Sequence, residues 1–412
     1  MSVSSSPGAN GNSFHVVVLG GNFAGISISH HLLRNILPAL STSPEFSYKL
    51  SLLTPNTHAV WKPGVPQALI NEKVKNVDDL FLSTQEAFSR YGDAFELVQG
   101  KAKSIDRESR KLFAEVHGST ALEELHYDAL VITTGTTAAS PLWTINGIHE
   151  DTKRAILDFR KSLEHCKTIL IAGGGAAGVE AAGIIAYHLP EKDITLLSGT
   201  DRVLPRKVRP SISQDAESQL IKLGVKVEHH IRVQSATPIT STHTPATLLH
   251  LTNNTTRAVD LYLDATGAIP NTSFAPKSWL TPTSYINTCE RTLRVLSSPS
   301  SDHGIYCSGD VASWSQHSVP ESQDPTLALG YSLFQDFHQP PPDSDSTHKR
   351  NKNNIKPIEY RPNRKDFLVV PIGGGGVGVL HGWRIPSFAV WLGKGRNFLQ
   401  GLFRGIVWGD KY

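Results

Sequence analysis

Two stretches of the chain share one hydrophobic pattern, in which an apolar run enters a glycine-rich turn and a segment rich in Ala and Ile follows. The first stretch is Val16 to Gly25 and the second is Thr168 to Gly178. Such apolar runs predict buried strands, and the segments behind the turns predict helices. Each stretch therefore predicts a strand, a tight turn and a helix, and Pro38 and Pro190 predict where the two helices end.

The glycines of these turns have separate roles. The first, Gly20 or Gly173, lets the strand reverse into the helix, and the third, Gly25 or Gly178, lets the helix pack on the strand. Unpaired N–H groups at a helix N-terminus attract an anion, so a pyrophosphate suits each turn. Two such turns predict that the chain binds two dinucleotides. The predicted contacts are Gly20, Gly21, Asn22, Phe23, Ala24 and Gly25 in the first turn and Gly173, Gly175 and Gly178 in the second.

The first turn departs from the usual pattern at two positions. Asn22 stands where the second glycine is expected, and because Asn tolerates left-handed backbone geometry we expect the turn to form. The following strand, Lys49 to Leu53, ends at Thr54 instead of a carboxylate. A hydroxyl can bond a ribose hydroxyl but lacks the charge, so we expect weaker binding here.

Three further predicted strands end in small polar residues. The runs 128–135 and 260–267 both end in Thr-Gly, and the run 304–310 ends in Gly-Asp. A carboxylate with a glycine beside it suits hydrogen bonding to a polyol chain. The predicted cofactor contacts at these strand ends are Thr134, Gly135, Gly267, Gly309 and Asp310.

The choice of nicotinamide cofactor depends on the residues after the strand 194–197. An NAD-specific site usually has a carboxylate at the position of Ser198, which repels a 2′-phosphate. Ser198 with Arg202 nearby therefore favours NADPH. NADH stays open, because Asp201 could turn toward the ribose.

In this order, the motifs resemble the pyridine nucleotide-disulfide oxidoreductase superfamily over about residues 14–335. The tail from Tyr360 to Arg396 resembles the apoptosis-inducing-factor-like (AMID-type) branch, which is similar to type II NADH dehydrogenases. The resemblance implies FAD in the first site, NADPH or NADH in the second, and a quinone-like acceptor. It implies cofactor contacts for Lys62, Gln67 and Ala102, a flavin ribityl contact for Asp310, and a catalytic position for Glu180 facing the nicotinamide.

One position departs from that branch, because Gln67 follows Pro66 where the branch has an arginine beside the flavin. Two other functions stay open. One is a biosynthetic flavin oxidoreductase acting on a specific small metabolite. The other is a flavoprotein that senses NAD(P)H with incidental turnover.

The predicted fold is of the α/β class. It has two Rossmann-like dinucleotide-binding domains arranged as in glutathione reductase, with the NAD(P) domain inserted in the FAD domain, and a small C-terminal β/α unit. The predicted parts are a disordered lead-in (1–12), the FAD domain (13–150 and 271–338), the NAD(P)H domain (151–270), a linker loop (339–356) and the C-terminal domain (357–412).

Composition narrows the function further. Forty basic and 37 acidic residues nearly cancel, which argues against nucleic acid as a partner. The three cysteines form no CxxC or CxxxxC pair, which argues against thiol chemistry at the flavin, and the 18 histidines show no metal-ligand spacing. Residues 1–12 have neither the apolar core of a signal peptide nor the arginines of a transit peptide, and no apolar run reaches 18 residues, so we expect neither a targeting segment nor a membrane span. We expect a cytoplasmic protein that is not secreted, with association to a membrane or mitochondrial surface left open.

The last thirty residues, Trp383 to Tyr412, carry five basic side chains and one acid. Apolar residues recur there at helical spacing, at Leu399, Leu402, Phe403 and Ile406. One interpretation is a helix that packs on the flavin domain. The other is a basic amphipathic surface for anionic lipid or a lipophilic substrate.

Overall fold

The computed structural model describes residues 13–40, 46–145, 147–205, 208–239, 246–297, 303–338, 355–362, 365 and 367–411. The predicted lead-in (1–12) and residues 339–354 of the predicted linker lie outside the described residues.

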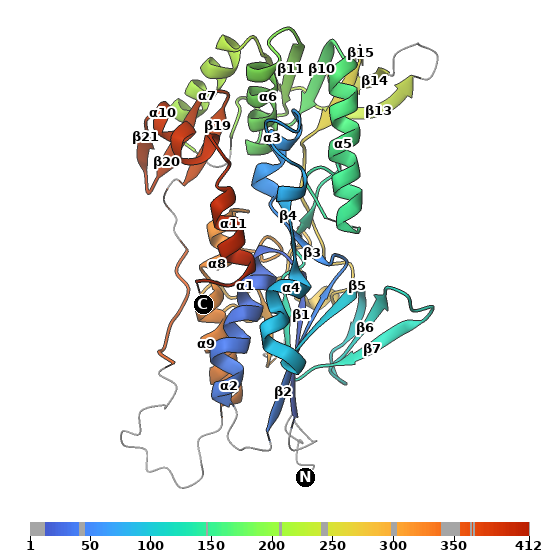
Figure 1. Ribbon diagram of the computed structural model, residues 1–412, viewed down its shortest axis with the longest axis vertical. Helices are drawn as coiled ribbons and strands as arrows, with labels where there is room; N and C mark the ends of the chain where they lie inside the picture. Colours follow the sequence, from blue (N-terminus) through green and yellow to red (C-terminus); the bar gives the residue numbers. More distant parts are fainter. Residues whose placement is uncertain are drawn as a thin grey trace.

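The first sheet has the strand order β18-β8-β1-β2-β5-β6-β7. Figure 1 labels β1, β2, β5, β6 and β7 of this sheet. The pairs from β18 to β5 are parallel, and β5 continues into an antiparallel meander with β6 and β7. The run 16–19 in β1 is buried along its length, as expected of a parallel strand covered on both faces. The strands are β1 (Ser13–Leu19), β2 (Ser47–Thr54), β5 (Phe95–Asp106), β6 (Lys111–Val116), β7 (Leu122–His126), β8 (Ala129–Ile132) and β18 (Ile305–Cys307).

The second sheet is parallel and has the order β12-β11-β10-β16. The chain leaves the first sheet after β8, builds the second sheet and returns with β18, so the predicted insertion of one dinucleotide-binding domain in the other is confirmed. The strands are β10 (Thr168–Ala172), β11 (Asp193–Ser198), β12 (Lys226–His229) and β16 (Leu261–Asp264), with a smaller sheet of β13 (Val233–Ile239), β14 (Ala246–Leu251) and β15 (Thr256–Val259). The helices are α5 (His149–His165), α6 (Ala176–His188) and α7 (Pro210–Lys222).

The two segments that cross between the domains pair with each other, as β9 (Thr136–Thr137) and β17 (Ile269–Pro270). Asn271, directly after β17, joins the two crossings, because its Nδ2 donates to Thr134 O (2.9 Å) and its backbone O accepts from Thr134 Oγ1 (2.7 Å). This pairing fixes the residues after β8 beside the first glycine turn.

The first helix does not end at Pro38, as the sequence predicted. It runs through α1 (Phe23–His31), a π-helical turn (Leu32–Ile36) and α2 (Leu37–Leu40). A π turn changes the partners of the helical hydrogen bonds, so the N–H that proline lacks costs less there. The second helix, α6, ends before Leu189 and Pro190, as predicted.

Shorter elements connect the first domain. They are β3 (His58–Val60), α3 (Val65–Ala68), β4 (Phe81–Ser83), α4 (Thr84–Phe88), α8 (Val319–Gln323) and α9 (Thr326–Phe337). The buried Arg160 of α5 joins the second domain to them, donating to Ala68 O and Lys75 O at 2.5 Å and to the Glu72 carboxylate at 2.9 Å.

The C-terminal unit packs against both domains (Figure 1). Its antiparallel sheet of β19 (Leu368–Ile372), β20 (Gly375–Leu380) and β21 (Trp383–Ile385) packs on α6 and α7. The chain then forms α10 (Ser387–Val390), a π-helical turn (Trp391–Gly395) and α11 (Gln400–Val407), and α11 lies against α1. Phe403 and Val407 are buried in this contact, so the tail helix does pack on the first domain.

Candidate functional site

The first glycine turn has the tight geometry that the sequence predicted. Gly20 has φ +105°, and a Cβ there would lie 2.4 Å from Thr133 O. A Cβ on Gly25 would lie 1.8 Å from Gly20 O. The first glycine is therefore required for the reversal, and the third for the approach of α1 to the turn.

Asn22 corrects one expectation. Its backbone is extended (φ −128°), not left-handed. Its side chain is held by the backbone of Val60 in β3: Nδ2 donates to Val60 O (3.3 Å) and Oδ1 accepts from Val60 N (3.2 Å). A non-glycine residue is tolerated here because these two hydrogen bonds fix its side chain on β3.

The second turn repeats the first. Gly173 has φ +122°, and a Cβ on Gly178 would lie 1.9 Å from Gly173 O. In the first turn a Cβ on Gly21 would lie 2.9 Å from Thr54 Oγ1, and in the second a Cβ on Gly174 would lie 2.8 Å from Ser198 Oγ. Thr54 and Ser198 thus occupy matching positions, each on the strand end beside its turn.

A cavity of about 760 Å³ extends from the first turn to the start of α6. Of the predicted site residues it is lined by Gly20, Gly21, Asn22, Phe23, Ala24, Thr54, Lys62, Ala102, Thr134, Gly135, Glu180, Gly309 and Asp310. The predicted residues Gly25, Gln67, Gly173, Gly175, Gly178, Ser198, Arg202 and Gly267 are outside this lining.

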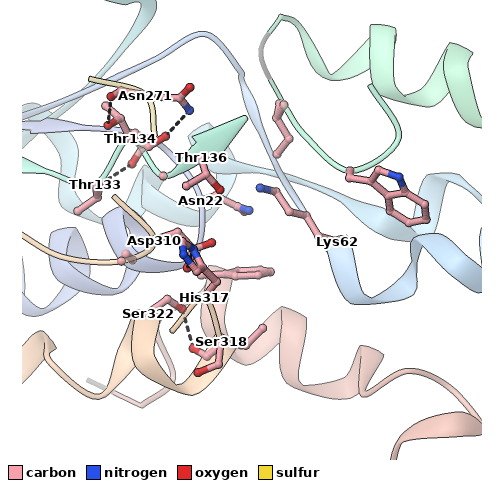
Figure 2. Close-up of a pocket in the computed structure, with 18 of the residues that line it drawn as sticks. Asn22, Lys62, Thr133, Thr134, Thr136, Asn271, Asp310, His317, Ser318 and Ser322 are labelled. Carbon is pink, nitrogen blue, oxygen red and sulfur yellow. Dashed lines mark hydrogen bonds and ion pairs between the residues drawn. The ribbon is translucent and has the colours of Figure 1, made fainter. Parts of the chain in front are cut away.

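Charged groups converge in the cavity. Figure 2 shows Lys62 pointing toward Asn22, with Asp310 and His317 on the opposite side. Asp310 Oδ1 lies 3.9 Å from His317 Nδ1. Burial lowers the pKa of Lys62, and the nearby Asp310 carboxylate acts in the opposite direction. An ammonium in such a place favours a ligand with negative charge.

Glu180 forms an ion pair that the sequence did not reveal. Its Oε1 lies 2.6 Å from Nζ of Lys394, which also donates to Val369 O (2.8 Å), and both side chains line the cavity. Burial raises the pKa of Glu180, while the Lys394 ammonium opposes the rise. Lys394 lies in the π-helical turn that follows α10. The tail was predicted as a surface or a packing helix, and it also supplies a charged group to the site.

Gln67, for which the resemblance implies a cofactor contact, is outside the cavity lining and binds the backbone of the tail. Its Nε2 donates to Gly395 O (3.2 Å) and Arg396 O (3.1 Å). Trp61 Nε1 donates to Phe398 O (2.7 Å). These bonds hold the segment that carries Lys394 against the first domain.

A family model described as pyridine nucleotide-disulphide oxidoreductase matches residues 14–328. The chain belongs to this family. An oxidoreductase named phnG from Penicillium herquei is 32% identical over 96% of this chain and 97% of its own length. The AMID-like ferroptosis suppressor protein 1 of Xenopus tropicalis is 27% identical over 62% of this chain and 63% of its own. The structure of a sulfide:quinone oxidoreductase from Aquifex aeolicus has a TM-score of 0.71 at 14% identity, covering 96% of this chain and 92% of that one.

Membership of the pyridine nucleotide-disulphide oxidoreductase family confirms the predicted resemblance and the predicted enzyme class. The chain is an NAD(P)H-dependent flavin oxidoreductase with FAD as its flavin. The residues fit FAD, because the cradle at Gly20 and Gly25 admits no side chain and Asp310 faces the cavity. None of the three cysteines, Cys166, Cys289 and Cys307, is among the described residues that line the cavity. No helix in the described ranges has the length and apolar character needed to cross a bilayer.

Proposed function

We propose that the chain takes a hydride from NAD(P)H at its flavin and passes the electrons to a quinone-like acceptor. The observation that carries the proposal is a single cavity that joins both dinucleotide-binding domains, from Gly20 and Asp310 to Glu180. When bound, FAD supplies the redox chemistry. The protein contributes by holding the two reacting groups in one place, which removes much of the entropic barrier.

The charged side chains suit this chemistry. Lys62 brings a cation to the cavity from the first domain, and Lys394 brings a second from the C-terminal unit. Glu180 balances Lys394 at 2.6 Å. Fixed charges in a cavity shielded from water stabilise charge that develops during reaction without reorganising. We therefore assign to Lys62 the electrostatic role that the AMID-type branch gives to an arginine at the position of Gln67.

We assign the acceptor to the apolar part of the cavity lining. Four large apolar residues of the lining are Trp143, Phe367, Leu399 and Leu402, and the last three come from the C-terminal part of the chain. A planar apolar molecule fits such a lining better than a charged one. Burying a charge without a partner costs several kcal/mol, on the order of the desolvation penalty of one ion, whereas an apolar molecule has no such cost. This favours a quinone-like acceptor.

The C-terminal segment of the chain carries exposed apolar side chains, which we call the apolar rim. We define the rim as Phe388, Trp391, Leu392 and Leu402, which are 71%, 38%, 60% and 55% exposed. Arg396, Arg404 and Lys411 lie in the same segment. Apolar side chains accompanied by cations suit the surface of an anionic membrane, where a lipophilic acceptor would be dissolved. We include this peripheral contact in the proposed function.

The proposal is tested by NADPH and NADH oxidation with a short-chain water-soluble quinone under nitrogen. We expect multiple turnovers. Leu402→Arg should raise the KM for the quinone while flavin bleaching by NADPH without quinone keeps its rate, because we assign Leu402 to the acceptor and not to the nicotinamide. Leu122→Arg is the matched control, because Leu122 on β7 is 56% exposed and Leu402 is 55% exposed. A single turnover followed by a long-lived charge-transfer band would instead indicate a sensor.

A biosynthetic oxidoreductase is the second candidate. The full-length similarity to a fungal protein named only as an oxidoreductase favours it. Such an enzyme would discriminate among acceptors through its cavity walls. A panel of quinones of one redox potential and different shapes separates the two: similar kcat/KM values support the quinone reductase, and activity with none of them refutes it.

A further inference from the structure

In a dinucleotide-binding domain of this type, the adenosine ribose of a nicotinamide nucleotide binds at the carboxyl edge of the sheet. β10, β11 and β12 are parallel, so their carboxyl ends meet at this edge. Ser198, the last residue of β11, lies beside Gly174 of the glycine turn. Because the pyrophosphate binds at the turn, the ribose hydroxyls fall at the end of β11. The side chains around Ser198 therefore decide between NADH and NADPH.

The two residues that the sequence suggested for this choice are engaged within their own loop. Ser198 is buried, and its hydroxyl donates to Arg202 O (2.8 Å) and lies 3.1 Å from Thr200 Oγ1. The Arg202 guanidinium donates through Nη2 to Pro205 O (3.0 Å), and its Nη1 is 3.9 Å from the Asp201 carboxylate. Neither residue is directed by these contacts to a phosphate on the ribose.

Arg232 lies over the same strand end from a different strand. It follows β12 by three residues, and its side chain crosses Gly199, the first residue after β11. Its Nε and Nη2 both lie 3.3 Å from Gly199 O. A Cβ on Gly199 would be 2.6 Å from Arg232 Nε, so the glycine makes room for the guanidinium. The backbone at Arg232 exchanges two 3.0 Å hydrogen bonds with Thr252, which fixes the point from which the side chain extends.

The geometry points to Arg232 as the residue that binds the 2′-phosphate of NADPH and makes the second site prefer NADPH. This rests on the proposed function only in taking the second turn as the nicotinamide nucleotide site. A guanidinium has five N–H donors, and only two of those in Arg232 are directed at Gly199 O. The exposed remainder of the fork matches a phosphate, with which arginine forms charge-assisted, often paired hydrogen bonds. No carboxylate stands at position 198 to repel the phosphate.

Binding of two fragments tests the assignment without any redox step. The probes are 2′,5′-ADP and 5′-AMP, which differ only in the 2′-phosphate, titrated calorimetrically into the FAD-loaded protein. We expect the wild-type protein to bind 2′,5′-ADP about tenfold to a hundredfold more tightly than 5′-AMP. Arg232→Gln should reduce this ratio to near one and leave 5′-AMP binding unchanged. Arg202→Gln and Arg154→Gln, the latter at an exposed arginine of α5, should keep the wild-type ratio.

The outcomes separate this assignment from the proposed function. Equal affinities for the two fragments in the wild-type protein, or a wild-type ratio in Arg232→Gln, would overturn the role of Arg232 while the nicotinamide site stands. If only Arg202→Gln removed the preference for 2′,5′-ADP over 5′-AMP, Arg202 and not Arg232 would be the residue that binds the 2′-phosphate. Binding of neither fragment would overturn the nicotinamide site and the proposed function together. In steady-state assays, Arg232→Gln should lower kcat/KM for NADPH by the same factor and leave that for NADH unchanged.

Discussion

Lys394 and Glu180 are 214 positions apart in the sequence, and their charged atoms lie 2.6 Å apart at the cavity. The pair joins the C-terminal unit to the helix that follows the second glycine turn. Only 7% of the Glu180 side chain and 16% of the Lys394 side chain are exposed. Removing one partner therefore leaves a charge that neither solvent nor another side chain compensates.

We predict that Lys394→Met destabilises the protein by about 3–5 kcal/mol and that Glu180→Gln in the same chain restores most of the loss, since the buried charge is then gone. Unfolding in urea, followed by tryptophan fluorescence, measures both. Lys411→Met, at an exposed lysine 3.6 Å from Asp324, is the control and should change stability little. A double variant no more stable than Lys394→Met would argue against a coupled pair.

The same pair gives a pH dependence. The folded-state pKa of Glu180 is raised above 4.5, so its protonated form favours the folded state. This stability is present below pH 4.5 and is lost as the pH rises through the folded-state pKa. Without the opposing ammonium the pKa rises further, so Lys394→Met should lose more stability between pH 5 and 8 than the wild-type protein. Thermal unfolding across this range measures how stability changes with pH in each protein. Adding Glu180→Gln to Lys394→Met should remove the extra loss of stability.

Buried histidines make the stability depend on pH in the opposite direction from Glu180. The buried His30 ring is within hydrogen-bond distance of Tyr91 OH (2.7 Å) and Val407 O (2.8 Å), and burial lowers its pKa to about 4. A lowered histidine pKa contributes stability above pH 6.5 that is lost as the pH falls toward 4, here about 3 kcal/mol. His31, with a pKa also near 4, adds to the loss. His30→Gln should flatten the fall of the unfolding midpoint between pH 6.5 and 4.5; an unchanged slope would contradict the assignment.

Flavin retention should depend more on Asp310 than on Thr54. The carboxylate can form charge-assisted hydrogen bonds with a polyol, each about twice as strong as a neutral one, whereas a hydroxyl forms neutral ones. Asp310→Ala should therefore lose FAD more readily on dilution than Thr54→Ala, as measured by flavin absorbance after gel filtration. Equal flavin content in the two variants would refute this ranking.

Gly178→Ala should abolish nicotinamide nucleotide binding and leave FAD bound. Its Cβ would be 1.9 Å from Gly173 O, so α6 would have to move away from the turn. Gly401→Ala, in α11 with open space around the new Cβ, is the control. Because alanine favours a helix over glycine, Gly401→Ala should stabilise the protein by up to about 1 kcal/mol.

Vesicle binding tests the apolar rim. Phe388→Ser combined with Leu392→Ser should weaken sedimentation with anionic vesicles, and salt should weaken the wild-type interaction. Leu122→Ser combined with Ile221→Ser removes apolar groups of similar exposure elsewhere and should have no effect. Truncation after Gly393 is a poorer test, because it also removes the buried Phe403 and Val407. Binding unaffected by the rim variant would exclude the rim as the membrane contact.

The sequence by itself determined the two glycine turns and their order. Gly20 and Gly173 adopt positive φ, and Gly25 and Gly178 approach backbone oxygens closely, as their positions predicted. These are local requirements: a strand, a reversal and a helix within about ten residues leave few alternatives to glycine. The inserted domain followed from the same motifs, because the second strand-turn-helix unit precedes the strand Ile305–Cys307 of the first sheet.

The tertiary structure alone decided the charged groups of the site. Lys394 and Arg232 are ordinary basic residues in the sequence, and only the docking of the C-terminal unit and the parallel order of β11 and β12 bring them to Glu180 and Gly199. Gln67 was assigned to the flavin by position, yet its amide binds backbone oxygens 328 and 329 residues away. Contacts between distant segments depend on how whole helices and strands pack on one another. The residues next to either partner in the sequence do not predict that packing.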